Sequence, residues 1–249
     1  MIADLKKRHD DVLAIIVSRY IETAEPVGSR FVSRKLGLSS ATIRNVMADL
    51  EDMGYITHPH TSAGRMPTDK GYRYYINSLM RVRGVSDNMI RAAQIQYHQA
   101  LRSLEDVLES TSHLISSLTN YVGITVLSQY EKLYMDGASH ILEQPEFRNI
   151  GKLHELLKCL EEKKDLFDLL SRDVDDDRLT IYIGKESHSS HLKDCSIVTR
   201  GYKVRGKTAG RLGVIGPKRM MYERVIPAVE YLAETVTTIL EEMKIEPGS

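Results

Sequence analysis

The chain has 249 residues, of which 42% are hydrophobic and 27% are charged, as in an ordinary globular protein of about two domains. No run of residues approaches the roughly 18 apolar residues that a membrane-spanning helix needs. The charged start MIADLKKRHDDV also lacks the apolar stretch of a secretory signal. Only two cysteines occur, Cys159 and Cys195, so no disulfide framework is predicted. We expect a cytoplasmic protein without a membrane partner.

The formal net charge of zero is unevenly distributed along the chain. Residues 1–84 contain 13 lysines and arginines against 9 acidic residues, whereas the rest of the chain contains 21 against 25. A basic N-terminal segment favours a polyanionic partner such as nucleic acid, although so small a difference is weak evidence by itself.

Two helices are predicted at the start of the chain. Apolar residues recur with helical spacing from Asp4 to about Thr23. The segment EPVGS (25–29) breaks this helix, because it contains both a proline and a glycine. Ser29 is expected to cap a second helix that runs to about Lys35.

A third helix is predicted to begin at Ser39 or Ser40 and to end before Gly54. The turn before it contains Gly37, and two helices joined by such a turn are typical of a helix-turn-helix. An ordinary amphipathic surface helix is the alternative, since helix pairs with a glycine turn are common. The apolar face of the third helix consists of Ile43, Val46, Met47 and Leu50.

The two halves of the third helix differ in charge. Its last turns carry Asp49, Glu51 and Asp52, which phosphates would repel, so the N-terminal half is expected to enter the major groove of double-stranded DNA. Arg30 of the second helix is expected to contact the DNA backbone. The small, hydrogen-bonding or cationic residues predicted to face base edges and adjacent phosphates are Ser40, Ala41, Thr42, Arg44 and Asn45.

The stretch YITHPHTSAGRMP (55–67) predicts two short strands joined by a loop, and Thr68 is expected to cap the helix that follows. A strand, a loop and a strand after a recognition helix form the wing of a winged helix. Hydroxyl, imidazole and guanidinium groups in the loop suit contact with phosphates or the minor groove. The wing residues predicted to touch DNA are His60, Thr61, Ser62 and Arg65.

Residues 20–75 closely resemble the N-terminal domain of the HrcA-type heat-inducible transcription repressors of bacteria, through the motifs EPVGS, SSATIRN and PHTSAGR. Residues 118–128, 133–147 and 210–236 resemble the GAF-like C-terminal region of that family. The resemblance implies a repressor of heat-shock and chaperone operons that binds an inverted-repeat operator as a homodimer. It also implies relief of repression under heat stress and modulation by a chaperonin of the GroEL type.

The chain departs from this family at one place. The family carries an inserted dimerisation domain where this chain has only Gln129, Tyr130, Glu131 and Lys132. Another surface is therefore needed to hold two copies together.

A long helix is predicted from Ser86, because its apolar residues alternate by four and three. This spacing is typical of a coiled-coil seam, which we expect to form the dimer contact. The alternative, on equal terms, is a helix packed along the sheet of its own domain. The seam residues assigned to dimerisation are Leu101, Leu104, Leu108 and Ile115.

The remaining chain predicts strands at 123–129, 133–137, 179–184, 195–204 and 208–216, and helices at 150–172 and 222–243. Adjacent strands accompanied by helices predict an antiparallel sheet with helices on one side, an α+β domain of the GAF type. The expected organisation is a winged helix-turn-helix over 1–84, followed by a GAF-like regulatory and dimerisation domain over 85–249.

The segment GYKVRGKT (201–208) matches the phosphate-loop pattern, but the residues after Thr208 are typical of a strand where a phosphate loop requires a helix. A hairpin turn is the preferred interpretation, and a nucleotide-dependent switch is the disfavoured alternative. A transcription regulator gated by a small ligand is a second alternative. His188, His191 and Cys195 lack regular metal-ligand spacing, and no catalytic arrangement is found. We expect no enzyme, metal or cofactor.

Overall fold

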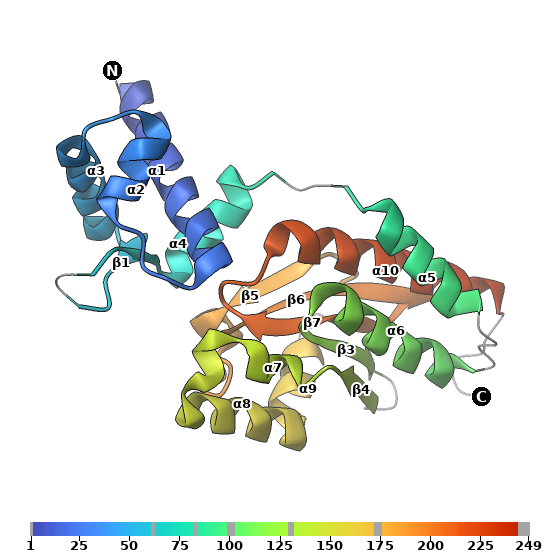
Figure 1. Ribbon diagram of the computed structural model, residues 1–249. Helices are drawn as coiled ribbons and strands as arrows, with labels where there is room; N and C mark the ends of the chain where they lie inside the picture. Colours follow the sequence, from blue (N-terminus) through green and yellow to red (C-terminus); the bar gives the residue numbers. More distant parts are fainter. Residues whose placement is uncertain are drawn as a thin grey trace. The chain divides into compact units, whose positions relative to one another are not determined.

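The computed structural model describes residues 2–60, 63–81, 84–98, 103–128, 132–171 and 176–243 (Figure 1). The chain divides into two compact units. One comprises Met1–Arg81 together with Lys218–Met221, and the other comprises Val82–Pro217 together with Tyr222–Ser249. The sequence placed the expected boundary after residue 84. Within the described residues, none of the helices combines the length and the apolar character needed to cross a membrane.

Three helices form the body of the first unit: α1 (Ile2–Thr23), α2 (Ser29–Leu36) and α3 (Ser40–Asp52). Gly37 ends α2 in the left-handed conformation (φ 67°), and the Ser33 hydroxyl donates to the Leu38 carbonyl at 2.6 Å. These contacts fix the turn of the predicted helix-turn-helix. Gly28 is the extended residue before α2, so Ser29 is the first helical residue and not the expected cap. The apolar core includes Val12, Ile16, Val32, Ile43 and Leu50.

The predicted wing follows α3. Strand β1 (Ile56–Thr57) pairs antiparallel with β2 (Met66–Pro67), with Ile56 opposite Pro67. Helix α4 (Asp69–Tyr74) and the π-helical turn η1 (Tyr75–Leu79) come next. The Thr68 hydroxyl accepts a hydrogen bond from the Gly71 amide at 3.1 Å, which confirms the predicted helix cap.

The second unit is built on a five-stranded antiparallel sheet in the order β4-β3-β7-β6-β5. Each strand coincides with a predicted one to within one or two residues at either end. The edge strands are therefore β4 and β5 (Figure 1). The strand bounds are β3 Val122–Leu127, β4 Lys132–Asp136, β5 Thr180–Ile183, β6 Cys195–Val204 and β7 Lys207–Pro217.

Helices cover both faces of this sheet, whereas the sequence predicted helices on one side only (Figure 1). The hydroxyl of Thr125 in β3 donates to the Leu108 carbonyl on one face, and its neighbours Ile124 and Val126 join an apolar cluster on the other. The first face carries α5 (Asp87–His98), α6 (Leu104–Thr119) and α10 (Tyr222–Glu242). The second carries α7 (His140–Glu143), η3 (Pro145–Arg148), α8 (Ile150–Glu162) and α9 (Lys164–Ser171), while η4 (Gly184–Ser187) follows β5.

Two helices, α5 and α6, stand where one long helix was predicted. Ser103 has an extended backbone, and its hydroxyl accepts from the Asp106 amide at 3.1 Å. The Asp106 carboxylate accepts in turn from the Ser103 amide at 3.0 Å, so a capping box starts α6 as a separate helix. The tract predicted at 150–172 is likewise divided, at Lys163, whose φ is 58°.

The dimerisation seam predicted on this helix is corrected by its burial. Leu108 and Ile115 are 0% exposed and Leu104 is 8% exposed within the single chain, so these side chains belong to the core of their own domain. Helix α6 can pack closely on β3 because Gly123 of β3 faces it. A Cβ at this position would clash with the Ser112 carbonyl of α6. Leu101 lies outside the described residues. The alternative of a helix packed on its own sheet is the correct one for the three described residues.

The segment that matches the phosphate-loop pattern is a hairpin, as preferred. Strands β6 and β7 pair up to Val204 and Lys207, and the turn consists of Arg205 (φ 51°) and Gly206 (φ 73°). Two successive positive φ angles are typical of a tight type I′ hairpin turn. Lys207 therefore opens a strand, and the helix N-terminus that would bind phosphate is not at this position.

Candidate nucleic-acid interface

Helix α3 is anchored by its apolar face and leaves its N-terminal half accessible. Ile43, Val46, Met47 and Leu50 are buried against the rest of the winged-helix unit. On the opposite face Ala41, Arg44 and Asn45 are exposed, and Ser40 and Thr42 are half-buried at the start of the helix. Arg30 is exposed on α2. The predicted recognition residues of α3 therefore lie away from its buried face, with Ala41, Arg44 and Asn45 accessible.

The first turn of α3 is held by a hydrogen-bonded cap. The Ser39 hydroxyl accepts from the Thr42 amide at 3.1 Å and is 2.9 Å from the Thr42 hydroxyl. Ser39 is therefore the cap and Ser40 the first helical residue, which resolves where the predicted helix begins. Because its hydroxyl is already engaged in this cap, Thr42 has less hydrogen-bonding capacity toward DNA than the sequence suggests.

The wing is attached to the body through the EPVGS segment. Val27 and Arg65 form an isolated antiparallel bridge, with amide-to-carbonyl distances of 2.8 and 2.9 Å. Gly64 approaches this segment so closely that a Cβ would lie 2.6 Å from the Val27 carbonyl carbon. A glycine is therefore required next to the bridge. EPVGS breaks a helix, as predicted, and also extends the wing sheet.

The sequence predicted that Arg65 projects from the wing tip toward DNA, but in the structure its guanidinium is engaged at the end of α3. Its guanidinium Nη2 lies 2.8 Å from Glu51 Oε2 at the end of α3, and the two side chains are 24% and 23% exposed. The other oxygen of the Glu51 carboxylate bonds to His58 Nδ1. Glu51 thus joins the recognition helix to both sides of the wing loop, and we call Glu51, His58 and Arg65 the wing latch.

Sequence reasoning missed the wing latch, because it treated Glu51 only as a charge that phosphates would repel. His60 is exposed, and its carbonyl accepts from the Ala63 amide at 2.9 Å to close the wing turn. Thr61 and Ser62 lie outside the described residues. Of the two predicted wing residues that the structure describes, His60 is exposed and Arg65 is half-buried.

Polar contacts from α4 hold the C-terminal end of α3 and connect α4 to α1. The Lys70 ammonium donates to the Met53 carbonyl at 2.8 Å, just after α3, and lies 4.6 Å from the centroid of the Tyr55 ring. The Tyr74 hydroxyl donates to Asp10 of α1 at 2.9 Å, and this hydrogen bond raises the pKa of Tyr74. These contacts fix the C-terminal end of α3 relative to α1 and α4.

Of the residues weighed as metal ligands, Cys195 is part of the apolar core and His191 contacts a carboxylate. Cys159 and Cys195 are buried in the apolar cluster of the second unit, and burial raises the pKa of the Cys159 thiol to about 12. His191 Nδ1 lies 2.6 Å from the Glu155 carboxylate. Over the part of the chain that the structure describes, no group of three or more metal-ligating side chains is present.

Two family models match the chain in separate regions. Residues 4–80 match the winged helix-turn-helix transcription repressor, HrcA DNA-binding model. Residues 124–226 match the model of the HrcA protein C-terminal domain. The first region contains α3, the wing and the wing latch, and the second contains most of the sheet.

Whole-chain relatives agree with these matches. The heat-inducible transcription repressor HrcA of Geobacter sulfurreducens is 33% identical, over 96% of this chain and 99% of its own. That of Pelotomaculum thermopropionicum is 30% identical, over 96% and 98%. The Geobacter alignment extends over 338 positions, so the relative carries residues without a counterpart among the 249 here.

One solved structure, of a hypothetical protein, resembles the chain with a TM-score of 0.73 at 20% identity, over 95% of this chain and 98% of its own. At that identity the likeness shows the fold alone. The matched models and the relatives over nearly the whole length show the family. This chain belongs to the HrcA heat-inducible transcription repressors.

Proposed function

We propose that this chain represses heat-shock and chaperone operons by binding an inverted-repeat operator as a homodimer, and that heat stress relieves the repression. In this proposal residues 1–84 bind DNA and residues 85–249 serve regulation and dimerisation. The observation that carries the proposal is the accessible face of the N-terminal half of α3, on a helix whose other end is tied to the wing, in a member of a repressor family.

The roles of individual residues follow from their positions. Arg44 and Asn45 are exposed on α3 and can form paired hydrogen bonds with guanine and adenine edges in the major groove. Ser40, Ala41 and Thr42 lie at the helix N-terminus, where small side chains and the positive end of the helix dipole favour approach to a phosphate. Arg30 and His60, which are exposed, are proposed to contact the DNA backbone together with Thr61 and Ser62 of the wing.

Two further parts of the proposal rest on the family. A homodimer is expected because an inverted repeat presents two equivalent half-sites, which a two-fold protein dimer matches. A chaperonin of the GroEL type is proposed as the partner that modulates the repressor. Both remain proposals for this chain.

Footprinting on the promoters of chaperone operons from the same genome tests the proposed function. The purified full chain is expected to protect an inverted repeat whose half-sites lie about one or two helical turns apart, on one face of the duplex. The variant Arg91→Ala serves as a control, because it removes an exposed arginine from α5, outside the winged-helix unit. Protection without sequence preference, or no protection at all, would contradict the proposal.

A further inference from the structure

Strand β4 leaves one side of the sheet open. It is hydrogen-bonded to β3 and lies at the end of the strand order, so within the described chain its other edge has no strand partner. Two hollows of about 710 and 640 Å³ flank this edge and share Leu133, Tyr134 and Lys163 among their lining residues. There is therefore space for a further strand and its side chains beside β4.

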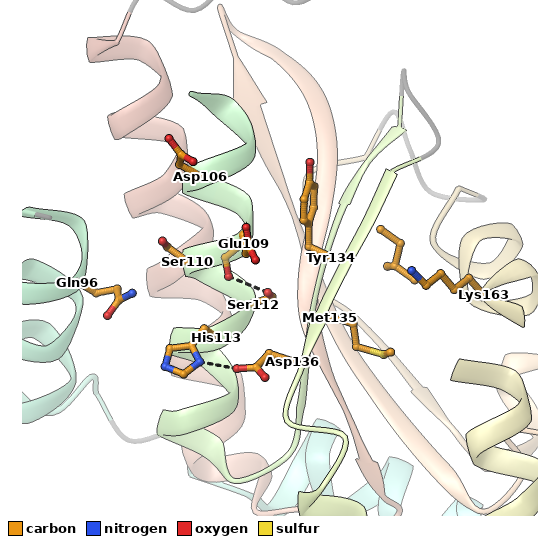
Figure 2. Close-up of a pocket in the computed structure, with 11 residues that line it drawn as sticks. Gln96, Asp106, Glu109, Ser110, Ser112, His113, Tyr134, Met135, Asp136 and Lys163 are labelled. Carbon is orange, nitrogen blue, oxygen red and sulfur yellow. Dashed lines mark hydrogen bonds and ion pairs between the residues drawn. The ribbon is translucent and has the colours of Figure 1, made fainter. Parts of the chain in front are cut away.

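The side chains of β4 alternate between the two faces of the sheet. Lys132 and Asp136 face α6, where they contact Glu105 at 3.0 Å and His113 at 2.5 Å. Tyr134 lies between Lys132 and Asp136 in the strand, so the alternation of side chains places it on the same face, and Figure 2 shows Tyr134 and Asp136 together. Leu133 and Met135 pack against the apolar cluster on the opposite face.

The sequence of β4, KLYMD, is complementary to itself when two copies run antiparallel. With a two-fold axis at Tyr134, Lys132 of each copy lies opposite Asp136 of the other, and Leu133 lies opposite Met135. Opposite charges then meet at both ends of the pair, and apolar side chains meet on the cluster side. In an antiparallel pair of strands a two-fold axis can pass through a hydrogen-bonded or a non-hydrogen-bonded residue pair. A two-fold axis at Tyr134 is therefore compatible with the backbone geometry in both cases.

We propose that β4 is a self-association edge, along which a second copy of this chain adds antiparallel and joins the two five-stranded sheets into one. The backbone amides and carbonyls on the open edge supply the hydrogen bonds of the pairing. The lysine-to-aspartate contacts fix its direction and register. The flanking hollows receive side chains of the second copy.

The existing ion pairs of β4 are compatible with this pairing. The side chains of Lys132 and Asp136 are 49% and 43% exposed, so both heads reach solvent beside their partners on α6. An ammonium has three donors and a carboxylate accepts several hydrogen bonds, which permits a second partner for each. Charges on an edge strand usually prevent pairing because like charges meet, and here opposite charges meet instead.

The other edge strand, β5, lacks charges that could pair with a second copy of itself. The residues of β5, Thr180–Ile183, are uncharged, so self-pairing there would have no charge to select its direction or register. The hollows of about 710 and 640 Å³ also lie along β4. Both observations favour β4 over β5 as the place of contact.

The inference rests on the proposed function in one respect, because pairing of two chains along β4 supplies the two-fold assembly that an inverted-repeat operator requires. Its test is made without DNA, so the association and the operator binding succeed or fail separately. A chain that footprints an operator but does not associate through β4 would contradict only this inference.

Charge reversal and exchange test the register in the full chain. Sedimentation velocity over a concentration series should show that Lys132→Asp or Asp136→Lys raises the dimer dissociation constant at least about tenfold, because two like-charge contacts replace two favourable ones. The double variant Lys132→Asp with Asp136→Lys should restore association to within about threefold of the original. Contacts within one chain cannot explain such a rescue. The aspartate introduced at position 132 would repel Glu105 of its own chain in the double variant just as it does in Lys132→Asp alone.

The matched control is Lys152→Asp, which breaks an exposed ion pair with Asp194 (2.9 Å) elsewhere on the same unit. It should leave association unchanged, and circular dichroism checks that every variant is folded. Association that is indifferent to all three β4 variants, or a double variant weaker than both single ones, would overturn the proposal.

Disulfide formation gives a second, independent test. Tyr134 is the residue that lies opposite itself, so Tyr134→Cys should form a covalent dimer on mild oxidation. Lys132→Cys or Asp136→Cys alone should not, whereas a mixture of these two variants should. The natural cysteines are buried, with Cys159 1% and Cys195 2% exposed, and the unmodified chain is the control. Equal cross-linking at all three positions, or none in any sample, would contradict the two-fold axis.

Discussion

Glu51 accepts a hydrogen bond from His58 and forms an ion pair with Arg65, so one carboxylate at the end of the recognition helix ties the wing to that helix. The half-burial of Glu51 and Arg65 makes this pair stronger than a fully exposed one, because water screens it less. The orientation of the wing relative to α3 decides whether both can reach DNA together. We therefore propose that Arg65 acts mainly by positioning the wing.

Glu51→Gln tests the wing latch. The substitution keeps the size of the side chain but removes the charge that Arg65 meets, so we expect a loss of about 1 kcal/mol in the free energy of unfolding. Operator affinity should fall as well, because the wing is less well positioned. Urea denaturation and fluorescence anisotropy measure the two effects.

The control for this prediction is Glu22→Gln, which weakens an exposed pair with Arg19 at 3.5 Å on α1. It should change stability by less than about 0.5 kcal/mol. If Glu51→Gln were as silent as the control in both measurements, the wing would be held by other contacts.

At the scale of elements, α6 is a core helix of the second unit. It begins at its own capping box, and its apolar residues face β3. A strip of leucines at spacings of three and four fits equally well against a partner helix or a sheet, so the spacing alone does not distinguish the two. The break at Ser103 removes the continuous helix that a coiled coil would need.

Leu108→Ala tests this placement. Removing a fully buried leucine should lower the free energy of unfolding by about 2–5 kcal/mol, since it leaves a cavity beside the sheet. The association state of the folded chain should not change. The matched control is Leu142→Ala on α7, whose side chain is 63% exposed and should contribute little. A stable Leu108→Ala chain that loses association would restore the coiled-coil interpretation.

The β6–β7 hairpin leads to a prediction about nucleotides. ATP or GTP should leave the melting temperature unchanged in the original chain and in Lys207→Ala alike, because Lys207 starts a strand. A ligand at 100 times its dissociation constant would stabilise the fold by about 2.7 kcal/mol, an effect that a thermal scan detects readily. A nucleotide-dependent shift that disappears in the variant would mean that the hairpin binds phosphate.

At the scale of the whole molecule, local signals predicted most of the fold. The helix-turn-helix, the wing and the strands of the second unit have caps, glycine turns and alternating patterns that lie within a few residues of one another. The capped start of α3 and the turn at Gly206 are examples. Such features depend on neighbouring residues, so one sequence suffices to find them.

Contacts between distant residues were not predictable in this way. The wing latch joins residues from the end of α3 and both sides of the wing loop, and nothing in the composition of either element indicates the partner. Arg211 is 1% exposed and donates to the Asp176 and Arg178 carbonyls, although an arginine in a strand usually suggests a surface position. Coverage of both sheet faces also depends on how connections cross the sheet.

The central claim is that the N-terminal half of α3 reads the operator sequence. Fluorescence anisotropy at fixed salt should compare the operator with a scrambled duplex for the original chain, Arg44→Ala and the control Arg91→Ala. We expect Arg44→Ala to weaken operator binding by about 1–3 kcal/mol while binding the scrambled duplex almost as the original does, so that discrimination falls. The control should keep both affinities. If Arg44→Ala retained full discrimination between the two duplexes, the account of α3 as the recognition helix would be contradicted.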